Sequence, residues 1–99
     1  SELKEEDFVR IEKAEKYMMG RGFKAVRVRC HDNLARIEVD QNDIDKLFNK
    51  VLLEEISGQL KEFGFKYVTL DLEGYRVGSF NETIGVGNLC LDIPGGNDE

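Results

Sequence analysis

One short pattern occurs twice in this sequence and constrains the order of its secondary structure. The pattern Gly-Phe-Lys-x-Val stands at residues 22–26 and again at residues 64–68. Each copy follows a stretch with helical apolar spacing and opens a run in which apolar and polar residues alternate. Glycine commonly ends a helix, and the phenylalanine after it would fill the seam between a helix and a sheet. The chain is therefore expected to contain two units in which a helix leads into a strand.

Apolar residues recur at helical spacing over residues 5–20 and 42–63, and each stretch is predicted to be helical. Asp40 or Asn42 is expected to cap the second stretch, and we expect a break near Asn49. The residues assigned to the buried helix faces are Phe8, Ile11, Ala14, Met18, Met19, Ile44, Leu47, Phe48, Val51, Leu52, Ile56, Leu60 and Phe63. These faces would cover one side of a sheet.

Alternation of apolar and polar residues predicts three strands, at residues 24–30, 34–39 and 67–72. A short polar turn at residues 31–33 joins the first two strands, which indicates a hairpin. The residues expected to face the core are Val26, Val28, Cys30, Ala35, Ile37, Val39, Val68, Leu70 and Leu72. The order α-β-β-α-β then predicts an α+β domain with two layers, a three-stranded mixed sheet and helices on one face.

The other face of the sheet is expected to stay open and polar, which favours a ligand or a partner there. It carries Arg27, Arg29, Arg36, Glu38, Tyr67, Thr69 and Asp71. Arginines on neighbouring strands are often a solvated face, and Glu38 or Asp71 could pair with them. Alternatively, Arg27 and Arg29 project in parallel from one strand and present two planar forks that suit phosphate or carboxylate. The pattern alone leaves both interpretations open.

Glu15 is an acid in an unexpected place. At about 100° per residue it falls between Ile11 and Met19, inside the apolar arc of the first predicted helix. An acid in such a position needs a partner. Either Glu15 forms a salt bridge at the edge of the core, or it points across the seam between helix and sheet toward a site.

A chain of 99 residues is expected to form one domain, too small for a complete nucleotide-dependent enzyme with separate cofactor and substrate domains. Its formal charge of -6 disfavours a general binder of nucleic acid or anionic membranes. No apolar run approaches the roughly 20 residues of a membrane span, and no signal peptide is recognisable. Cys30 and Cys90 lie far apart, outside any zinc or redox spacing, so we expect a reducing, cytoplasmic compartment.

The end of the sequence differs from the rest in composition. Residues 83–99 are rich in Gly, Asn and Asp, and we expect most of them to form a flexible tail. Residues 89–93 are the one apolar patch of this tail and would add a short edge strand. The domain itself is assigned to residues 1–82. Because the sequence begins at Ser1 rather than at methionine, we expect it to be a piece of a longer protein.

Five stretches of the sequence, taken together, point to one enzyme family. They are Ala14-Glu15, Gly22-Phe23, Val26-Arg27-Val28-Arg29, Leu34-Ala35-Arg36-Ile37-Glu38 and GFKYVTLDLEGYRVGSFNE at residues 64–82. This set resembles the C-terminal region of the ATP-dependent sacrificial sulfur transferases, the LarE-like enzymes of nickel-pincer cofactor synthesis. The resemblance covers about residues 5–82. Its last stretch, residues 64–82, is long, which makes the match to the family specific.

The resemblance implies a PP-loop ATP pyrophosphatase that adenylylates a pyridine-dicarboxylate mononucleotide, attaches it to the enzyme and transfers sulfur to it from a cysteine or a cluster. It places ATP and Mg in an N-terminal PP-loop domain of the same chain, whose S-G-G-x-D-S motif is missing here. The donor cysteine of such enzymes precedes the first helix, and neither Cys30 nor Cys90 matches that place. This sequence alone would therefore bind no cofactor and would not turn over.

The same resemblance implies roles for three residues and matches a fourth. Arg27 and Arg29 match the family's Arg-x-Arg pair, which would act in catalysis beside the donor cysteine and the substrate phosphate. Glu15 matches an acid that would hold a metal or the substrate. Arg76 matches the family's Gly-Tyr-Arg loop, for which the resemblance gives no role. Arg76 and Arg36, which lies on the arginine face, are assigned to substrate binding.

Departures from the family pattern leave the substrate open: His31-Asp32-Asn33 replaces a His-Gly turn, and Val77 and Phe80 are variants in the last motif. The expected partners are the PP-loop domain and further copies of the chain, with neither nucleic acid nor membrane. The alternative function is a non-catalytic module for oligomerisation or protein interaction. An RNA-binding module is less favoured, because the sequence has no Gly-x-x-Gly clamp, no aromatic stacking platform and an unsuitable charge.

Overall fold

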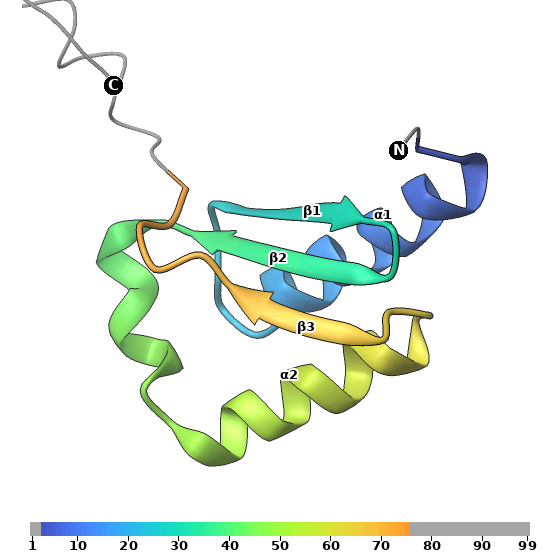
Figure 1. The fold of residues 1–99 in the computed structure, drawn as a ribbon. Coiled ribbons are helices and arrows are strands. Elements are labelled where there is room, and N and C mark those ends of the chain that lie inside the picture. Colours follow the sequence, from blue (N-terminus) through green and yellow to red (C-terminus); the bar gives the residue numbers. More distant parts are fainter. Residues whose placement is uncertain (1–2, 76–99) are drawn as a thin grey trace, which may run out of the picture.

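The structure, a computed structural model, describes residues 3–75. In this part of the chain the elements are helix α1 (Glu5–Gly20), strand β1 (Val26–His31), strand β2 (Leu34–Val39), the 3-10 helix η1 (Gln41–Leu47), helix α2 (Lys50–Glu62) and strand β3 (Tyr67–Leu70). They form the predicted α+β fold, a mixed sheet with helices against one face (Figure 1). The predicted tail and its short strand lie outside the described residues, as do Arg76 and Cys90.

The described strands form one sheet with the order β1-β2-β3. β1 and β2 are antiparallel, and the turn between them holds Asp32 at a φ of 57°. Aspartate tolerates this left-handed conformation, which two-residue hairpin turns require. β3 lies parallel to β2, and the helical segment between them carries the chain back across the sheet. The predicted hairpin and the predicted mixed sheet are both confirmed.

The hydrophobic core lies between the helices and the inner face of the sheet. Its buried residues are Ala14, Met18, Phe23, Val26, Val28, Cys30, Ala35, Ile37, Val39, Leu47, Ile56, Leu60 and Phe65. α1 packs along β1, and α2 packs along β3. Every second residue of β1 is buried, as the alternation predicts, so the remaining side chains of this strand face the open side of the sheet.

The repeated Gly-Phe pattern ends both α-helices in the same way. The Phe23 N–H donates to the Met18 carbonyl oxygen at 3.2 Å, and the Phe65 N–H donates to the Leu60 carbonyl oxygen at 3.3 Å. The glycine before each phenylalanine has a positive φ, 102° in the first copy and 117° in the second. These are Schellman motifs, in which a left-handed residue lets the last helical carbonyls find donors. Both phenylalanines are buried at the seam between the layers, as predicted.

The second predicted helix is broken at Asn49, also as predicted. The Asn49 side-chain oxygen accepts a hydrogen bond from the Leu52 N–H at 3.1 Å and caps α2. The Asp40 carboxylate caps η1 in the same manner, through the Asn42 N–H at 3.0 Å. No helix within residues 3–75 is both long and apolar enough to cross a membrane.

β3 is shorter than predicted. It ends at Leu70, and the Leu72 side chain is 78% exposed. The Asp71 carboxylate accepts a hydrogen bond from the Glu73 N–H at 3.0 Å, and the Gly74 N–H donates to the Asp71 carbonyl at 3.0 Å. These bonds turn the chain directly after Leu70. The prediction that Leu72 faces the core is therefore wrong.

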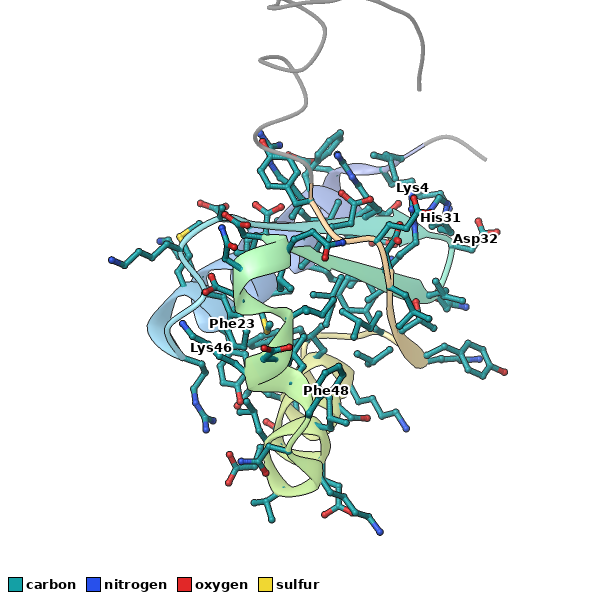
Figure 2. All side chains as sticks on the ribbon, turned by 90° about the vertical axis from the view of Figure 1, so that its left-hand side faces the viewer. Lys4, Phe23, His31, Asp32, Lys46 and Phe48 are labelled. Carbon is teal, nitrogen blue, oxygen red and sulfur yellow. The ribbon has the colours of Figure 1, made fainter. Side chains whose placement is uncertain are left out.

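Four apolar side chains that were assigned to the core are exposed: Phe8, Met19, Phe48 and Val51. The sheet covers only one stripe of each helix, so apolar residues at the margin of that stripe remain outside. Phe48 is 76% exposed, and Figure 2 shows it at the junction between η1 and α2. The predicted burial is wrong for these four residues.

Candidate functional site

The open face of the sheet carries a network of two arginines and two carboxylates. Arg29 donates from Nε to Glu38 Oε1 at 3.2 Å, and Arg36 Nη1 lies 3.2 Å from Glu38 Oε2. The same Arg36 nitrogen donates to Asp71 Oδ2 at 2.8 Å. Arg29 and Arg36 are directly opposite each other in the β1–β2 register. The two carboxylates therefore offset the repulsion between neighbouring guanidinium groups.

Glu38 occupies the centre of this network. It lies on the open face, as the alternation predicted, and only 8% of the residue is exposed. Its two partners, Arg29 and Arg36, are each about two-fifths exposed. The predicted pairing of the arginines with Glu38 and Asp71 is thus confirmed for Arg29 and Arg36. Their guanidinium groups are held in place while part of each still faces solvent.

Asp71 links the network to the loop that follows β3. The pKa of its carboxyl is lowered, first by the hydrogen bond from the Glu73 N–H and then by the Arg36 guanidinium. Asp71 is therefore ionised at neutral pH. One carboxylate shapes the turn after β3 and also orients an arginine on β2.

Arg27 differs from the other two arginines of the open face. It faces Glu38 in the β1–β2 register but makes no ion pair among residues 3–75. Its guanidinium carbon lies 5.4 Å from the centroid of the Tyr75 ring, which is cation–π distance. A guanidinium that lies over a ring keeps its in-plane N–H donors, so within residues 3–75 the N–H groups of Arg27 are available to bind an anion.

A groove of about 490 Å³ lies at the edge of β1 that pairs with no other strand of residues 3–75. It is lined by Leu3, Phe8, Ile11, Glu15, Arg27, Val28, Arg29, Cys30, His31 and Arg36. One wall is apolar and comes from α1 and the residues before it. The other wall is basic and comes from the open face of β1 and β2. Figure 2 shows His31 at the end of this strand, beside the turn.

Glu15 reaches the groove from α1. Its Oε2 accepts a hydrogen bond from the Val28 N–H at 3.0 Å, between the two arginines of β1 in sequence. Glu15 therefore has a partner, as predicted, but the partner is an edge amide of the sheet rather than a basic side chain. Residues 3–75 contain no group of three or more His, Cys, Asp or Glu side chains arranged to hold a metal ion. The metal-binding role of Glu15 remains a prediction.

The structure thus brings most of the predicted site residues together. Glu15, Arg27, Arg29 and Arg36 all line the groove beside β1. Arg76 lies outside the described residues, so its predicted role is untested.

The structure also contains a second cluster of charged residues, around Arg10, that was not predicted from the sequence. Arg10 donates to the carbonyl oxygens of Gly64 at 2.9 Å and Asp32 at 3.1 Å, forms an ion pair with Asp7, and lies 4.8 Å above the Phe65 ring. It joins α1 to the β1–β2 turn and to the loop before β3. The sequence signal was the Asp7 and Arg10 spacing of three, which favours an ion pair on a helix but does not reveal the distant carbonyl partners.

Cys30 lies beside this cluster. It is buried, and its thiol donates to the Asp32 carbonyl oxygen at 3.2 Å. Burial raises the pKa of the Cys30 thiol. The prediction that Cys30 is a small core residue is therefore confirmed, and its environment disfavours the reactive thiolate.

Comparison with known proteins relates the chain to a synthase and to two uncharacterized proteins. It is 40% identical over 88 residues to the pyridinium-3,5-bisthiocarboxylic acid mononucleotide synthase of Lactiplantibacillus plantarum, which covers 89% of the chain and 31% of the synthase. It is 42% identical over 83 residues to an uncharacterized protein of Synechocystis, covering 84% of the chain and 31% of that protein. A protein of Methanocaldococcus jannaschii, also uncharacterized, is 40% identical over 75 residues, covering 76% of the chain and 29% of that protein.

The chain spans about a third of the length of the curated relatives it matches. No protein-family model matches it. The chain is homologous to one region of the mononucleotide synthase. The remaining two-thirds of that enzyme have no counterpart in the present sequence.

Proposed function

We propose that this chain is the C-terminal part of an ATP-dependent sulfur transferase, and that the groove beside β1 binds an anionic group of its substrate. Homology to a region of the mononucleotide synthase supports the reaction class. The product in the name of that enzyme carries a phosphate and two sulfur-bearing carboxyl groups. Such a molecule needs cationic, planar recognition of the kind that arginine forks provide.

The observation that carries the proposal is the convergence of Arg27, Arg29 and Glu15 on one groove. Arg29 is oriented by Glu38, whereas Arg27 makes no ion pair within the described residues. The Arg27 fork would bind the anion directly. Arg29, fixed at its Nε by Glu38, would add a second donor from its exposed end, and Arg36 would extend the basic wall.

The described residues do not by themselves make a metal site. Glu15 is the carboxylate that lines the groove, and one of its oxygens already accepts the Val28 N–H. Mg²⁺ is commonly bound by one or two carboxylates together with substrate phosphates and waters, so Glu15 could contribute a single ligand only. ATP would bind in the PP-loop domain, whose motif is absent from this sequence.

The test uses the full-length protein that contains this region. Arg27→Ala and Arg29→Ala should each lower kcat/KM for sulfur transfer by about ten- to a hundredfold, the usual loss when a charged hydrogen bond to substrate is removed. The double variant should abolish transfer. Arg21→Ala is the matched control, because Arg21 is an exposed arginine that pairs with Glu55 away from the groove. Circular dichroism should show that all the variants are folded.

Retained transfer in the folded double variant would reject the role of the two arginines. A loss of the same size in Arg21→Ala would also contradict the proposal, because the effect would then follow from removing any arginine. Arg27→Lys keeps the charge without the planar fork, and we expect it to restore only part of the activity.

A second candidate function is supported by the β3 side of the molecule. β3 is an edge strand among the described strands, and its Tyr67 side chain is 63% exposed. An apolar groove of about 260 Å³ lies beside it, lined by Ile37, Leu47, Leu53, Ile56, Ser57, Val68, Thr69 and Leu70. Unpaired edges and apolar grooves favour protein contacts, so we propose as the alternative a non-catalytic oligomerisation module.

Light scattering of the chain tests the oligomerisation module. Further copies of the chain are expected partners under the first proposal as well, so a monomer is the result that decides between the two. A stable multimer that dissociates when Tyr67 or Arg36 is substituted would support the oligomerisation module. A monomer at micromolar concentration would contradict it and would leave the sulfur transferase as the better proposal.

A further inference from the structure

The loop after β3 is fixed to the end of β2. The Tyr75 N–H donates to the Val39 carbonyl oxygen at 2.7 Å, and Tyr75 forms a parallel bridge with Asp40. Gly74 has a φ of 76°, and a Cβ at this position would collide with the same Val39 carbonyl. The backbone therefore approaches β2 as closely as only glycine allows. This contact determines where the next side chain, Tyr75, begins.

The other end of the loop is also fixed. Asp71 accepts the Glu73 N–H with one carboxylate oxygen and pairs with Arg36 through the other. The Gln41 side-chain amide donates to the Glu73 carbonyl oxygen. Side chains of β2, η1 and the loop thus hold residues 71–75 in one conformation, and that conformation places the Tyr75 ring on the open face of the sheet.

The ring meets Arg27 there. Glu38, the residue opposite Arg27 in the register, has both oxygens committed to Arg29 and Arg36. The Arg27 guanidinium lies over the aromatic face of Tyr75 instead, with its carbon 5.4 Å from the ring centroid. A guanidinium that lies over a ring is restrained in position but keeps its in-plane N–H donors.

We propose that Tyr75 is a positioning residue: its ring holds the Arg27 guanidinium over the open face of β1 so that the N–H groups face the groove. The inference deepens the proposed function and rests on it, since the groove is where the anion would bind. It assigns a role to the Tyr75 side chain, for which the sequence indicated none. Asp71 and Gly74 contribute to this positioning because they fix the conformation of the loop.

The first measurement follows the position of Arg27 without any ligand. In proton NMR spectra of the chain, the Arg27 Hδ and Hε resonances should be shifted upfield by the ring current of Tyr75. Tyr75→Phe should keep the shift, and Tyr75→Leu should remove it. Phe48→Leu is the matched control, because Phe48 is an exposed aromatic residue at the junction between η1 and α2, outside both the groove and the loop. A wild-type spectrum without the shift would overturn the inference.

The second measurement is a titration with inorganic phosphate. Loss of an exposed cation–π contact corresponds to about two- to fivefold weaker binding, so Tyr75→Leu should weaken phosphate binding by this factor. Tyr75→Phe and Phe48→Leu should bind as the wild type does, and Arg27→Ala should bind more weakly than Tyr75→Leu. The phenylalanine variant thereby excludes the hydroxyl as the cause. The ring-current shift on Arg27 connects the loss of binding to the position of the guanidinium, because a role in stability alone would not produce that shift.

The outcomes separate the two proposals. If Arg27→Ala weakens phosphate binding while Tyr75→Leu does not, the proposed anion site is supported and the positioning role of Tyr75 is rejected. If the wild type binds no phosphate, the proposed anion site is rejected. The ring-current shift alone then decides whether Tyr75 positions Arg27.

Discussion

Glu15 of α1 and Val28 of β1 meet at the β1 edge of the described sheet, where the Glu15 carboxylate accepts the Val28 N–H at 3.0 Å. An edge strand presents unpaired backbone groups that must find a partner or water. Glu15 supplies that partner and joins α1 to the strand that carries two arginines of the candidate groove. The acid has a structural role whatever its part in chemistry.

Replacing Glu15 separates the two roles. Glu15→Ala removes the acceptor and should lower the free energy of unfolding by about 1 to 3 kcal/mol, measured by urea denaturation. Glu15→Gln keeps a side-chain oxygen in the same place and should stay near the wild type in stability. If the carboxylate charge also serves the substrate or a metal, Glu15→Gln should lose activity in the full-length enzyme while remaining folded. Equal stability of the alanine variant and the wild type would contradict the structural role.

The loop after β3 gives a prediction about Gly74. Its φ of 76° and the nearby Val39 carbonyl leave no room for a Cβ, so Gly74→Ala should destabilise the domain by about 1 to 3 kcal/mol. Gly58 is the matched control. It lies inside α2, with nothing within 4 Å of the position that a Cβ would take, so Gly58→Ala should raise stability by about 0.5 to 1 kcal/mol. Thermal unfolding of the two variants should therefore shift in opposite directions, and a shift in the same direction would count against this account of the loop.

Much of this fold was predictable because its signals act over a few residues. The glycines that end the helices form hydrogen bonds within one turn of chain, and the alternation in β1 and β2 depends only on the period of a strand. The break at Asn49 is likewise a local capping interaction. Each of these features was visible in the sequence alone.

The features that the sequence did not reveal depend on distant partners. β3 ends early because Asp71 bonds to the loop and to Arg36, 35 residues away in the chain. Phe48 is exposed because the sheet does not extend over the junction where it lies, although its spacing matches the helical stripe. Hydrophobic periodicity identifies the side of a helix, but the neighbouring elements decide how wide the covered stripe is.

For the candidate site, the sequence predicted which face the arginines share but not how they are paired. The alternation of side chains along a strand predicted that Arg27, Arg29 and Arg36 lie on one face of the sheet, and the structure confirms this. Which of them is paired could not be read from the pattern, because Glu38 could have reached any of the three. The structure pairs it with Arg29 and Arg36, so Arg27 is the arginine that depends on an aromatic ring instead.

The charged cluster at the start of α1 predicts how stability depends on pH. The pKa of the Asp7 carboxyl is lowered, first by the Lys4 N–H and then by the Arg10 guanidinium. The folded chain therefore holds fewer protons than the unfolded chain between the two pKa values. The stability that Asp7 contributes is present above the ordinary aspartate pKa of about 3.9 and is lost as the pH falls through the lower, folded-state pKa.

Asp7→Asn should remove this dependence. The variant should be less stable than the wild type near neutral pH, because Arg10 loses its charged partner, and the difference should shrink on acidification. Urea unfolding at about pH 7, 5, 4 and 3 measures both the stability difference near neutral pH and its decrease in acid. Asp45→Asn, at an exposed position of η1, is the control and should follow the wild-type curve. If the asparagine variant at position 7 lost stability in acid as steeply as the wild type, Asp7 would not be the group responsible, and Asp71, whose pKa is also lowered, would be the next to replace.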